Sequence, residues 1–149
     1  MSASGVVGTF VRGAAAPDAG RCAELLTELG YPSSGEALVR RMKALLARPD
    51  YRVAVATREE MVVGLGAVHV FPAIHSDQPL AFIAALVVGA AHRGAGVGAR
   101  LVAELEAFAA SHGCDRILVT TATRRDGAHR FYERLGYDFT GRRYAKRLG

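Results

Sequence analysis

An apolar run that ends in a glycine-rich turn is the feature that most restricts how this chain can fold. Residues 82–88 are uniformly hydrophobic, and Arg93, Gly94, Gly96 and Gly98 follow before an amphipathic helix begins. This order indicates a strand that leads through a turn into a helix N-terminus. The first N–H groups of a helix lack intrahelical partners, and glycine lets a ligand approach them closely. The segment therefore predicts an anion site, for a phosphate or a pyrophosphate.

The bulk composition is that of one globular domain, which we assign to residues 1–149. Half of the residues are hydrophobic and 22% are charged, which excludes a disordered chain. No apolar stretch approaches the roughly 18 residues of a membrane span, and no signal sequence is recognisable, so we expect a cytoplasmic protein. Cys22 and Cys114 lie far apart, so no metal site is predicted. We interpret both as small buried hydrophobes, with a catalytic thiol as the alternative.

Positive charge is concentrated near the C-terminus. The net charge is +5, and from Arg116 onward nine basic residues oppose three acidic ones, so this segment alone carries +6. A solvated surface, attraction of an anionic cofactor and nucleic-acid binding all fit this charge. The aromatic residues of the segment lie where a small domain needs core residues, so nucleic-acid binding is the lesser alternative.

Hydrophobic periodicity predicts a mixed α/β fold in the order β, α, α, β, β, β, α, β, α, β, β. The predicted strands are 6–11, 52–57, 61–70, 82–88, 116–121, 137–140 and 142–148. The first helix runs from Pro17 to Gly30, the second begins at a capping box over residues 33–36, and the last covers 126–135. A loop at 71–79 is expected to meet a ligand. The helix after the glycine turn connects two strands, which implies a parallel, right-handed crossover.

The turn itself fits more than one ligand. Residues 94–99 (GAGVGA) match the dinucleotide fingerprint GxGxx(G/A), but that fold places the turn after the first strand of a βα series. Here the turn follows a hairpin. The ATPase pattern is absent because no lysine lies near the turn. The remaining alternative is that the glycines only allow close helix packing.

A second motif narrows the choice of ligand for the glycine turn. Residues 131–137 read FYERLGY, an aromatic pair on a helix followed by a Leu-Gly-aromatic break. Together with Arg93, Gly96 and Gly98 in the pattern (R/Q)xxGx(G/A), this motif resembles the GCN5-related N-acetyltransferase (GNAT) superfamily. The order of elements matches as well, and the resemblance spans essentially the whole chain. It implies a mixed, mostly antiparallel sheet of six to seven strands with a splayed parallel pair, flanked by about four helices.

The resemblance implies acetyl-CoA as co-substrate, no metal, and direct transfer of the acetyl group to a primary amine. A small-molecule amine is the favoured acceptor. A strongly cationic acceptor is not indicated, because the first two helices and the 71–79 loop contain few acidic residues to meet a polycation. Protein or peptide acetylation, a non-catalytic acyl-CoA sensor and a nucleic-acid-binding module are the alternatives. Homodimers are frequent in the family, and no membrane partner is expected.

The resemblance implies which residues of this sequence contact the cofactor. Backbone groups of the central strand would bind the pantetheine arm, and backbone amides of the turn would hold the pyrophosphate. The strand positions are Leu86, Val87 and Val88. The turn positions are Gly94, Ala95, Gly96, Val97, Gly98 and Ala99, flanked by Arg93. Arg125 stands where the family often has asparagine, and could pair with a phosphate.

For catalysis, Tyr132 matches the family's general acid, which protonates the departing thiolate; the alternative is an aromatic that only packs. A backbone N–H of Val87 or Val88 is the expected oxyanion donor. The base is not evident, because residues 80–88 contain no acid. His69 on the preceding strand and His75 beside Asp77 in the loop are the base candidates, with a water chain or a neutral substrate as alternatives.

Overall fold

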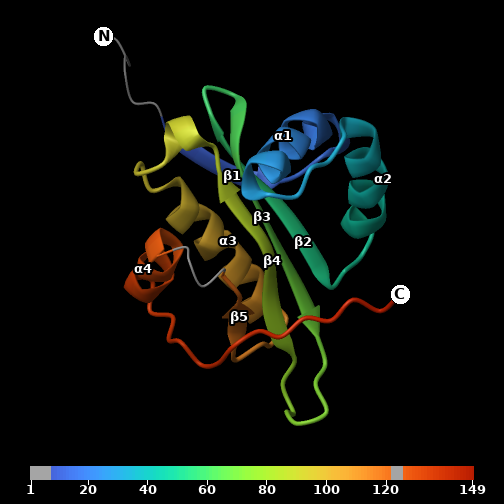
Figure 1. Ribbon diagram of the computed structural model, residues 1–149, viewed down its shortest axis with the longest axis vertical. Coiled ribbons are helices and arrows are strands. Elements are labelled where there is room, and N and C mark those ends of the chain that lie inside the picture. Colours follow the sequence, from blue (N-terminus) through green and yellow to red (C-terminus); the bar gives the residue numbers. More distant parts are fainter. Residues whose placement is uncertain (1–7, 122–125) are drawn as a thin grey trace. The chain divides into compact units, whose positions relative to one another are not determined.

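The computed structural model describes residues 8–121 and 126–149 (Figure 1). The chain divides into two compact units, Met1–Leu118 and Val119–Gly149. The helices are η1 (Ala16–Asp18), α1 (Ala19–Leu29), α2 (Gly35–Leu46), η2 (Ala90–His92), α3 (Val97–Ser111) and α4 (Asp126–Arg134). The strands are β1 (Thr9–Gly13), β2 (Tyr51–Arg58), β3 (Met61–Phe71), β4 (Leu80–Val88) and β5 (Ile117–Val119).

The strands form one sheet in the order β1-β2-β3-β4-β5. The first four are antiparallel neighbours, and β5 follows β4 through the crossover helix α3. The predicted mixed sheet is therefore confirmed. The predicted hairpin is confirmed too: Glu59 and Glu60 connect β2 to β3 with φ values of 51° and 65°. Two left-handed residues in a two-residue loop match the twist of the flanking strands.

Helices cover both faces of the sheet, with α1 and α2 on one face and α3 on the other (Figure 1). On the first face, Leu25 and Met42 pack against Val55, Leu65 and Val87 in one buried cluster. On the second, Leu101 and Leu105 are completely buried. A Cβ on Gly64 would lie 2.9 Å from Leu101 Cδ1, so glycine on β3 lets α3 approach the sheet closely.

The interpretation of the cysteines holds for Cys22 and only partly for Cys114. Cys22 lies in the core of α1, fully buried, and burial raises the pKa of its thiol to about 11. It therefore stays protonated at neutral pH and packs as a small hydrophobe. Cys114 is only partly buried, although burial again raises its pKa.

The start of α2 differs from the prediction by one residue. Ser34, not Ser33, is the N-cap, and its Oγ accepts a hydrogen bond from the Ala37 N–H at 3.1 Å. Because the third helical residue is then Ala37 rather than Glu36, no side chain returns the bond, and the predicted capping box is wrong. The end of α1 at Gly30, with φ of 111°, is as expected.

The predicted first strand also shifts toward the C-terminus. Pairing with β2 runs from Thr9 opposite Arg58 to Gly13 opposite Ala54, so the strand ends after the expected residue 11. Residues 6 and 7 of the prediction lie outside the described residues. The bounds of β1 are fixed by how far it pairs with β2. The alternation of apolar and polar residues within 6–11 does not reveal this pairing.

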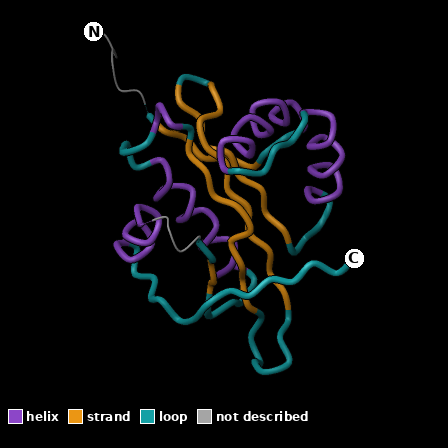
Figure 2. The backbone as a smooth tube through the Cα atoms, viewed as in Figure 1, coloured by secondary structure: helices purple, strands orange, loops and turns teal. Residues whose placement is uncertain are grey.

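The two predicted strands at the C-terminus are wrong. Residues after α4 form no strand and run as an extended loop (Figure 2). Phe139 is 80% exposed and Tyr144 87% exposed, so no face of the segment is buried. A strand is stabilised by a paired neighbour and a buried face, and this basic segment obtains neither within its unit. Within residues 8–121 and 126–149 the sheet accordingly has five strands rather than six to seven.

Candidate functional site

The site begins at a bulge in β4. Ala67 on β3 pairs with Ala85, whereas the next residue, Val68, pairs with Ile83, so Ala84 is an extra residue in β4. The Ala84 side chain is exposed. A bulge takes one residue out of the hydrogen-bonded ladder and turns the strand locally, which frees backbone groups in the middle of β4.

The outer edge of β4 is only partly covered by β5. The Ala81 N–H donates to the Arg116 carbonyl at 3.1 Å, which places the start of β5 beside the start of β4. Beyond this point β4 continues to Val88, whereas β5 already ends at Val119. Leu86, Val87 and Val88 thus extend past the shorter strand, and the predicted pantetheine positions lie on this part of β4. Leu86 and Val88 are partly exposed, and Val87 is buried.

The glycine turn presents the start of α3. Gly94 and Gly96 have φ values of 82° and 81°. The first helical bond runs from the Arg100 N–H to the Gly96 carbonyl at 3.2 Å, so the N–H groups of Val97, Gly98 and Ala99 precede the helical ladder. Residues 93–96 are exposed. Exposed donors at the positive end of a fifteen-residue helix are suited to an anion.

The packing alternative does not account for these two glycines. A Cβ on Gly94 or Gly96 would meet nothing within 4 Å, so their left-handed backbone, rather than close packing, requires glycine. Arg93 joins the turn to the strand, because its Nε donates to the Val88 carbonyl at 3.1 Å. Arg125, the remaining predicted cofactor residue, lies outside the described residues.

Tyr132 lies on α4 in the second unit and is 8% exposed. Its ring makes edge contacts with Phe131 and Tyr137, at centroid distances of 5.0 and 5.4 Å. The Tyr137 N–H donates to the Tyr132 carbonyl at 3.0 Å, where α4 ends. Burial raises the pKa of the Tyr132 phenol to about 12, so the hydroxyl keeps its proton at neutral pH.

The two base candidates have different surroundings. His69 is partly buried between two rings, 5.5 Å from Tyr51 and 5.6 Å from Phe71. Its Nε2 lies 3.5 Å from Asp50 Oδ2. His75 is exposed in the loop, and among the described residues it makes no hydrogen bond or ion pair with Asp77. The structure thus gives a carboxylate neighbour to His69 only.

Sequence reasoning missed Asp50, which lies in the α2–β2 connection. Its carboxylate accepts two hydrogen bonds from Arg48, at 2.9 Å from Nε and 2.8 Å from the terminal nitrogen. These bonds hold the pKa of Asp50 below its usual value. The short spacing of Arg48 and Asp50 around Pro49 was the available signal, but only the β2–β3 register brings His69 to the same place.

Sequence reasoning also missed the approach of α1 to the turn. Glu28 Oε1 accepts a hydrogen bond from the Ala90 N–H at 3.2 Å, and Arg21 Nε donates to the Val62 carbonyl at 2.9 Å. An open groove of about 550 Å³ runs along this helix. Its lining residues are Gly20, Arg21, Ala23, Glu24, Thr27, Glu28, Ser33 and Gly35. Charges of both signs therefore lie beside the carboxyl end of β4.

Two further findings concern residues 8–121 and 126–149. No helix among them is long and apolar enough to cross a membrane. No group of three or more histidine, cysteine, aspartate or glutamate side chains among them could hold a metal ion.

The fold is an α/β protein in which a bulged strand, β4, leads into an exposed helix N-terminus. Residues 20–137 match the acetyltransferase (GNAT) family. The chain belongs to this family, and it is accordingly an N-acetyltransferase.

One curated relative agrees with this assignment, and two solved structures share the fold. An aminoalkylphosphonate N-acetyltransferase of Salmonella typhimurium is 32% identical over 127 residues, which cover 85% of this chain and 80% of that protein. A structure described as a transcriptional regulator from Bacillus halodurans superposes with a TM-score of 0.88 at 25% identity, covering 95% of this chain and all of the other. An aminoglycoside N-acetyltransferase in complex with CoA superposes with a TM-score of 0.87 at 16% identity, covering 99% of each chain.

Proposed function

We propose that this protein transfers the acetyl group of acetyl-CoA to the primary amine of a small molecule. The observation that carries the proposal is the continuous path from the bulge at Ala84, along the uncovered end of β4, to the amides at the start of α3. An extended, amide-rich arm with a pyrophosphate at one end matches such a path. An aminoglycoside N-acetyltransferase of the same fold is known in complex with CoA, which supports this choice of ligand.

In this proposal the cofactor contacts are main-chain contacts. Backbone groups of Leu86, Val87 and Val88 bind the pantetheine arm, and the amides of residues 94–99 bind the pyrophosphate, with Arg93 beside them. Glycine at two exposed, left-handed positions leaves those two positions of the turn without side chains. Main-chain donors at a helix N-terminus are fixed before the ligand arrives, so little ordering is needed on binding.

The reaction is direct attack on the thioester. The neutral amine nitrogen forms a bond to the carbonyl carbon, the oxyanion is stabilised by the N–H of Val87 or Val88, and the carbon–sulfur bond then breaks. Tyr132 donates its phenolic proton to the thiolate, and the tyrosinate recovers a proton from the new amide nitrogen. His69 or His75 removes the first proton from the ammonium form of the acceptor.

The acceptor is a small amine in this proposal. The Salmonella relative is named for aminoalkylphosphonates, which carry an amine and an anionic group on a short chain. The groove along α1 is lined by Arg21, which forms an ion pair with Glu24 at 3.0 Å, and by Glu28, so charges of both signs lie along it. Aminoalkylphosphonates are thus the first acceptors to test, before aminoglycosides, polyamines, amino acids and peptides.

The test is a screen for release of the CoA thiol with these acceptors, combined with acetyl-CoA binding measured by calorimetry. Thiol release with a small amine is the expected result. Acetyl-CoA binding without thiol release from any amine would favour an acyl-CoA sensor instead. Activity with peptides alone would favour a protein acetyltransferase.

A variant pair tests the position of the pyrophosphate. Ala95→Asp places a carboxylate in the exposed turn, where it should repel the pyrophosphate and raise the KM for acetyl-CoA by about tenfold or more. Ala95→Ser changes the same side chain without charge and should leave KM nearly unchanged. Equal KM values for the two variants would place the pyrophosphate elsewhere.

A further inference from the structure

His69 lies beside the β4 bulge, although it belongs to β3. It pairs with Phe82, and the neighbouring pair, Val68 with Ile83, directly precedes the extra residue Ala84. Partners in an antiparallel ladder point to the same face, so His69 shares a face with Phe82 and with Tyr51, its partner on β2. Tyr51 packs against the cluster under α1 and α2. The imidazole therefore lies on the α1–α2 face, one residue pair away from the bulge.

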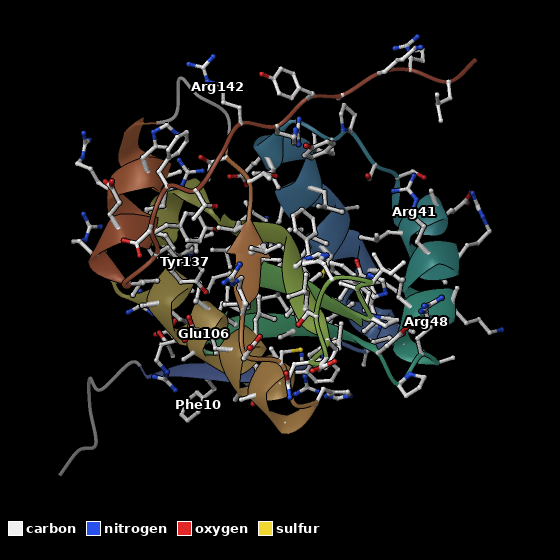
Figure 3. The ribbon with its side chains drawn as sticks, turned by 90° about the horizontal axis from the view of Figure 1, so that it is seen from below. Phe10, Arg41, Arg48, Glu106, Tyr137 and Arg142 are labelled. Atoms are coloured by element: carbon white, nitrogen blue, oxygen red, sulfur yellow. The ribbon has the colours of Figure 1, made fainter. Side chains whose placement is uncertain are left out.

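Two charged side chains, Arg48 and Asp50, lie between solvent and this imidazole. Arg48 follows the C-terminal end of α2 (Figure 3) and holds the Asp50 carboxylate through two hydrogen bonds. One carboxylate oxygen, Oδ2, also faces His69 Nε2 at 3.5 Å. This distance is longer than a strong hydrogen bond, but it becomes an ion pair when the imidazole is protonated. His69 remains accessible, with 34% of its side chain exposed.

We propose that His69 is the catalytic base, and that Asp50, held in place by Arg48, stabilises the imidazolium that forms during the reaction. The inference rests on the acetyltransferase function proposed above and identifies its missing proton acceptor. The ammonium group of the acceptor passes one proton to Nδ1 of His69, because Nε2 faces the carboxylate, and the nitrogen lone pair is then free to attack the thioester. The imidazolium later releases this proton to solvent. Asp50 and Arg48 touch no substrate and are positioning residues.

The two positioning residues act on His69 with opposite signs. The negative charge of Asp50 favours the imidazolium, whereas the positive charge of Arg48 disfavours it and weakens the field of the carboxylate. Two aromatic rings, Tyr51 and Phe71, also lie beside the imidazole, and burial raises the pKa of the Tyr51 phenol. The charge of Asp50 and that of the arginine bound to it can therefore be removed separately.

The test is the pH profile of kcat/KM for the amine, together with an NMR titration of the His69 ring. A base must be unprotonated, so activity falls as the pH drops through the titration of His69. Asp50→Asn removes the negative charge and should move this acidic limb to lower pH. Arg48→Met leaves the carboxylate unopposed and should move the limb to higher pH. A purely structural role would not produce opposite shifts.

His69→Ala should lower kcat by about a hundredfold or more, and imidazole in the buffer should restore part of the rate. His75→Ala removes the rival base candidate in the neighbouring loop, and if His69 is the base this variant keeps the acidic limb. The proposal is overturned if His69→Ala keeps the limb, or if Asp50→Asn and Arg48→Met shift it in the same direction. The NMR titration needs no activity, so failure to find any acceptor would refute the proposed function alone.

Discussion

At Tyr132, burial of the side chain directly affects the proposed role of the phenol as proton donor. Its phenol is almost completely buried, and burial raises its pKa to about 12. We expect Tyr132→Phe to lower kcat by about a hundredfold while the KM for acetyl-CoA changes little, because the lost proton is needed only as the thiolate leaves. Steady-state kinetics with a fixed amine measures both constants. An unchanged kcat across the pH range would reduce Tyr132 to a packing residue.

Asp18 is a buried carboxylate with a structural role. It accepts hydrogen bonds from two Arg12 nitrogens, at 2.8 and 2.9 Å, and from the Ala15 N–H at 2.8 Å. The bonds from Arg12 are the main reason that the pKa of Asp18 is lowered. A lowered pKa stabilises the fold above the carboxyl's unfolded value, near 4, and this contribution is lost as the pH falls through the lower folded value.

We therefore expect Asp18→Ala to lower the free energy of unfolding by about 1–3 kcal/mol at neutral pH and by less in acid. Urea denaturation at neutral pH and near pH 3 measures the difference. Asp77→Ala, in the exposed loop, is the control and should change neither value. An equal loss at both pH values would show that Asp18 contributes through packing rather than through its charge.

At the scale of elements, the contact between β3 and α3 connects stability with the cofactor site. A Cβ on Gly64 would lie 2.9 Å from Leu101 Cδ1 and 3.3 Å from Val97 Cγ1, and both side chains are buried in α3. Gly64→Ala should destabilise the protein by about 1–3 kcal/mol and raise the KM for acetyl-CoA, because Val97 begins the helix whose amides face the turn. Thermal unfolding and kinetics measure the two effects.

Gly20→Ala is the matched control for this variant. Gly20 lies in α1, where an added Cβ meets nothing within 4 Å, so alanine should be neutral or stabilising there. If Gly64→Ala were as stable as Gly20→Ala and bound acetyl-CoA normally, the close approach of α3 would not position the site.

Elements with a buried face were predictable, and elements without one were not. The apolar run that became β4 and the four-residue period that became α3 both report packing against a core, and the structure confirms both. Residues 137–148 have strand-like composition, but their side chains are exposed after Tyr137, so composition alone misled the prediction. The bounds of β1 depend on its pairing with β2, which is distant in sequence.

Some features of the candidate site were likewise predictable from the sequence, and others were not. The glycine turn before α3 was predictable, because glycine spacing and a following helix are local signals. The bulge at Ala84 was not, since it is a mismatch between two strands and each strand alone is regular. Asp50 was missed for a related reason: its closeness to His69 arises from pairing of β2 with β3. Proximity between distant segments is created by the fold.

At the scale of the whole molecule, charge and the predicted anion site belong to different units. From Val119 onward the chain has eight basic and three acidic residues, which equals the entire net charge of +5. The first unit is therefore neutral overall, although it contains the amides at the start of α3. Long-range attraction of an anionic cofactor would then come mainly from the second unit, in which Arg142 and Arg143 are exposed.

This distribution predicts how salt affects the enzyme. We expect kcat/KM for acetyl-CoA to fall severalfold as ionic strength rises from about 0.01 to 0.15 M, because the Debye length shortens from about 30 to 8 Å. Arg142→Glu with Arg143→Glu should lower the rate at low salt and flatten this dependence. Arg40→Glu with Arg41→Glu, on the exposed surface of α2, makes the same charge change and should have the smaller effect. Equal effects of the two pairs would mean that net charge, rather than the C-terminal segment, attracts the cofactor.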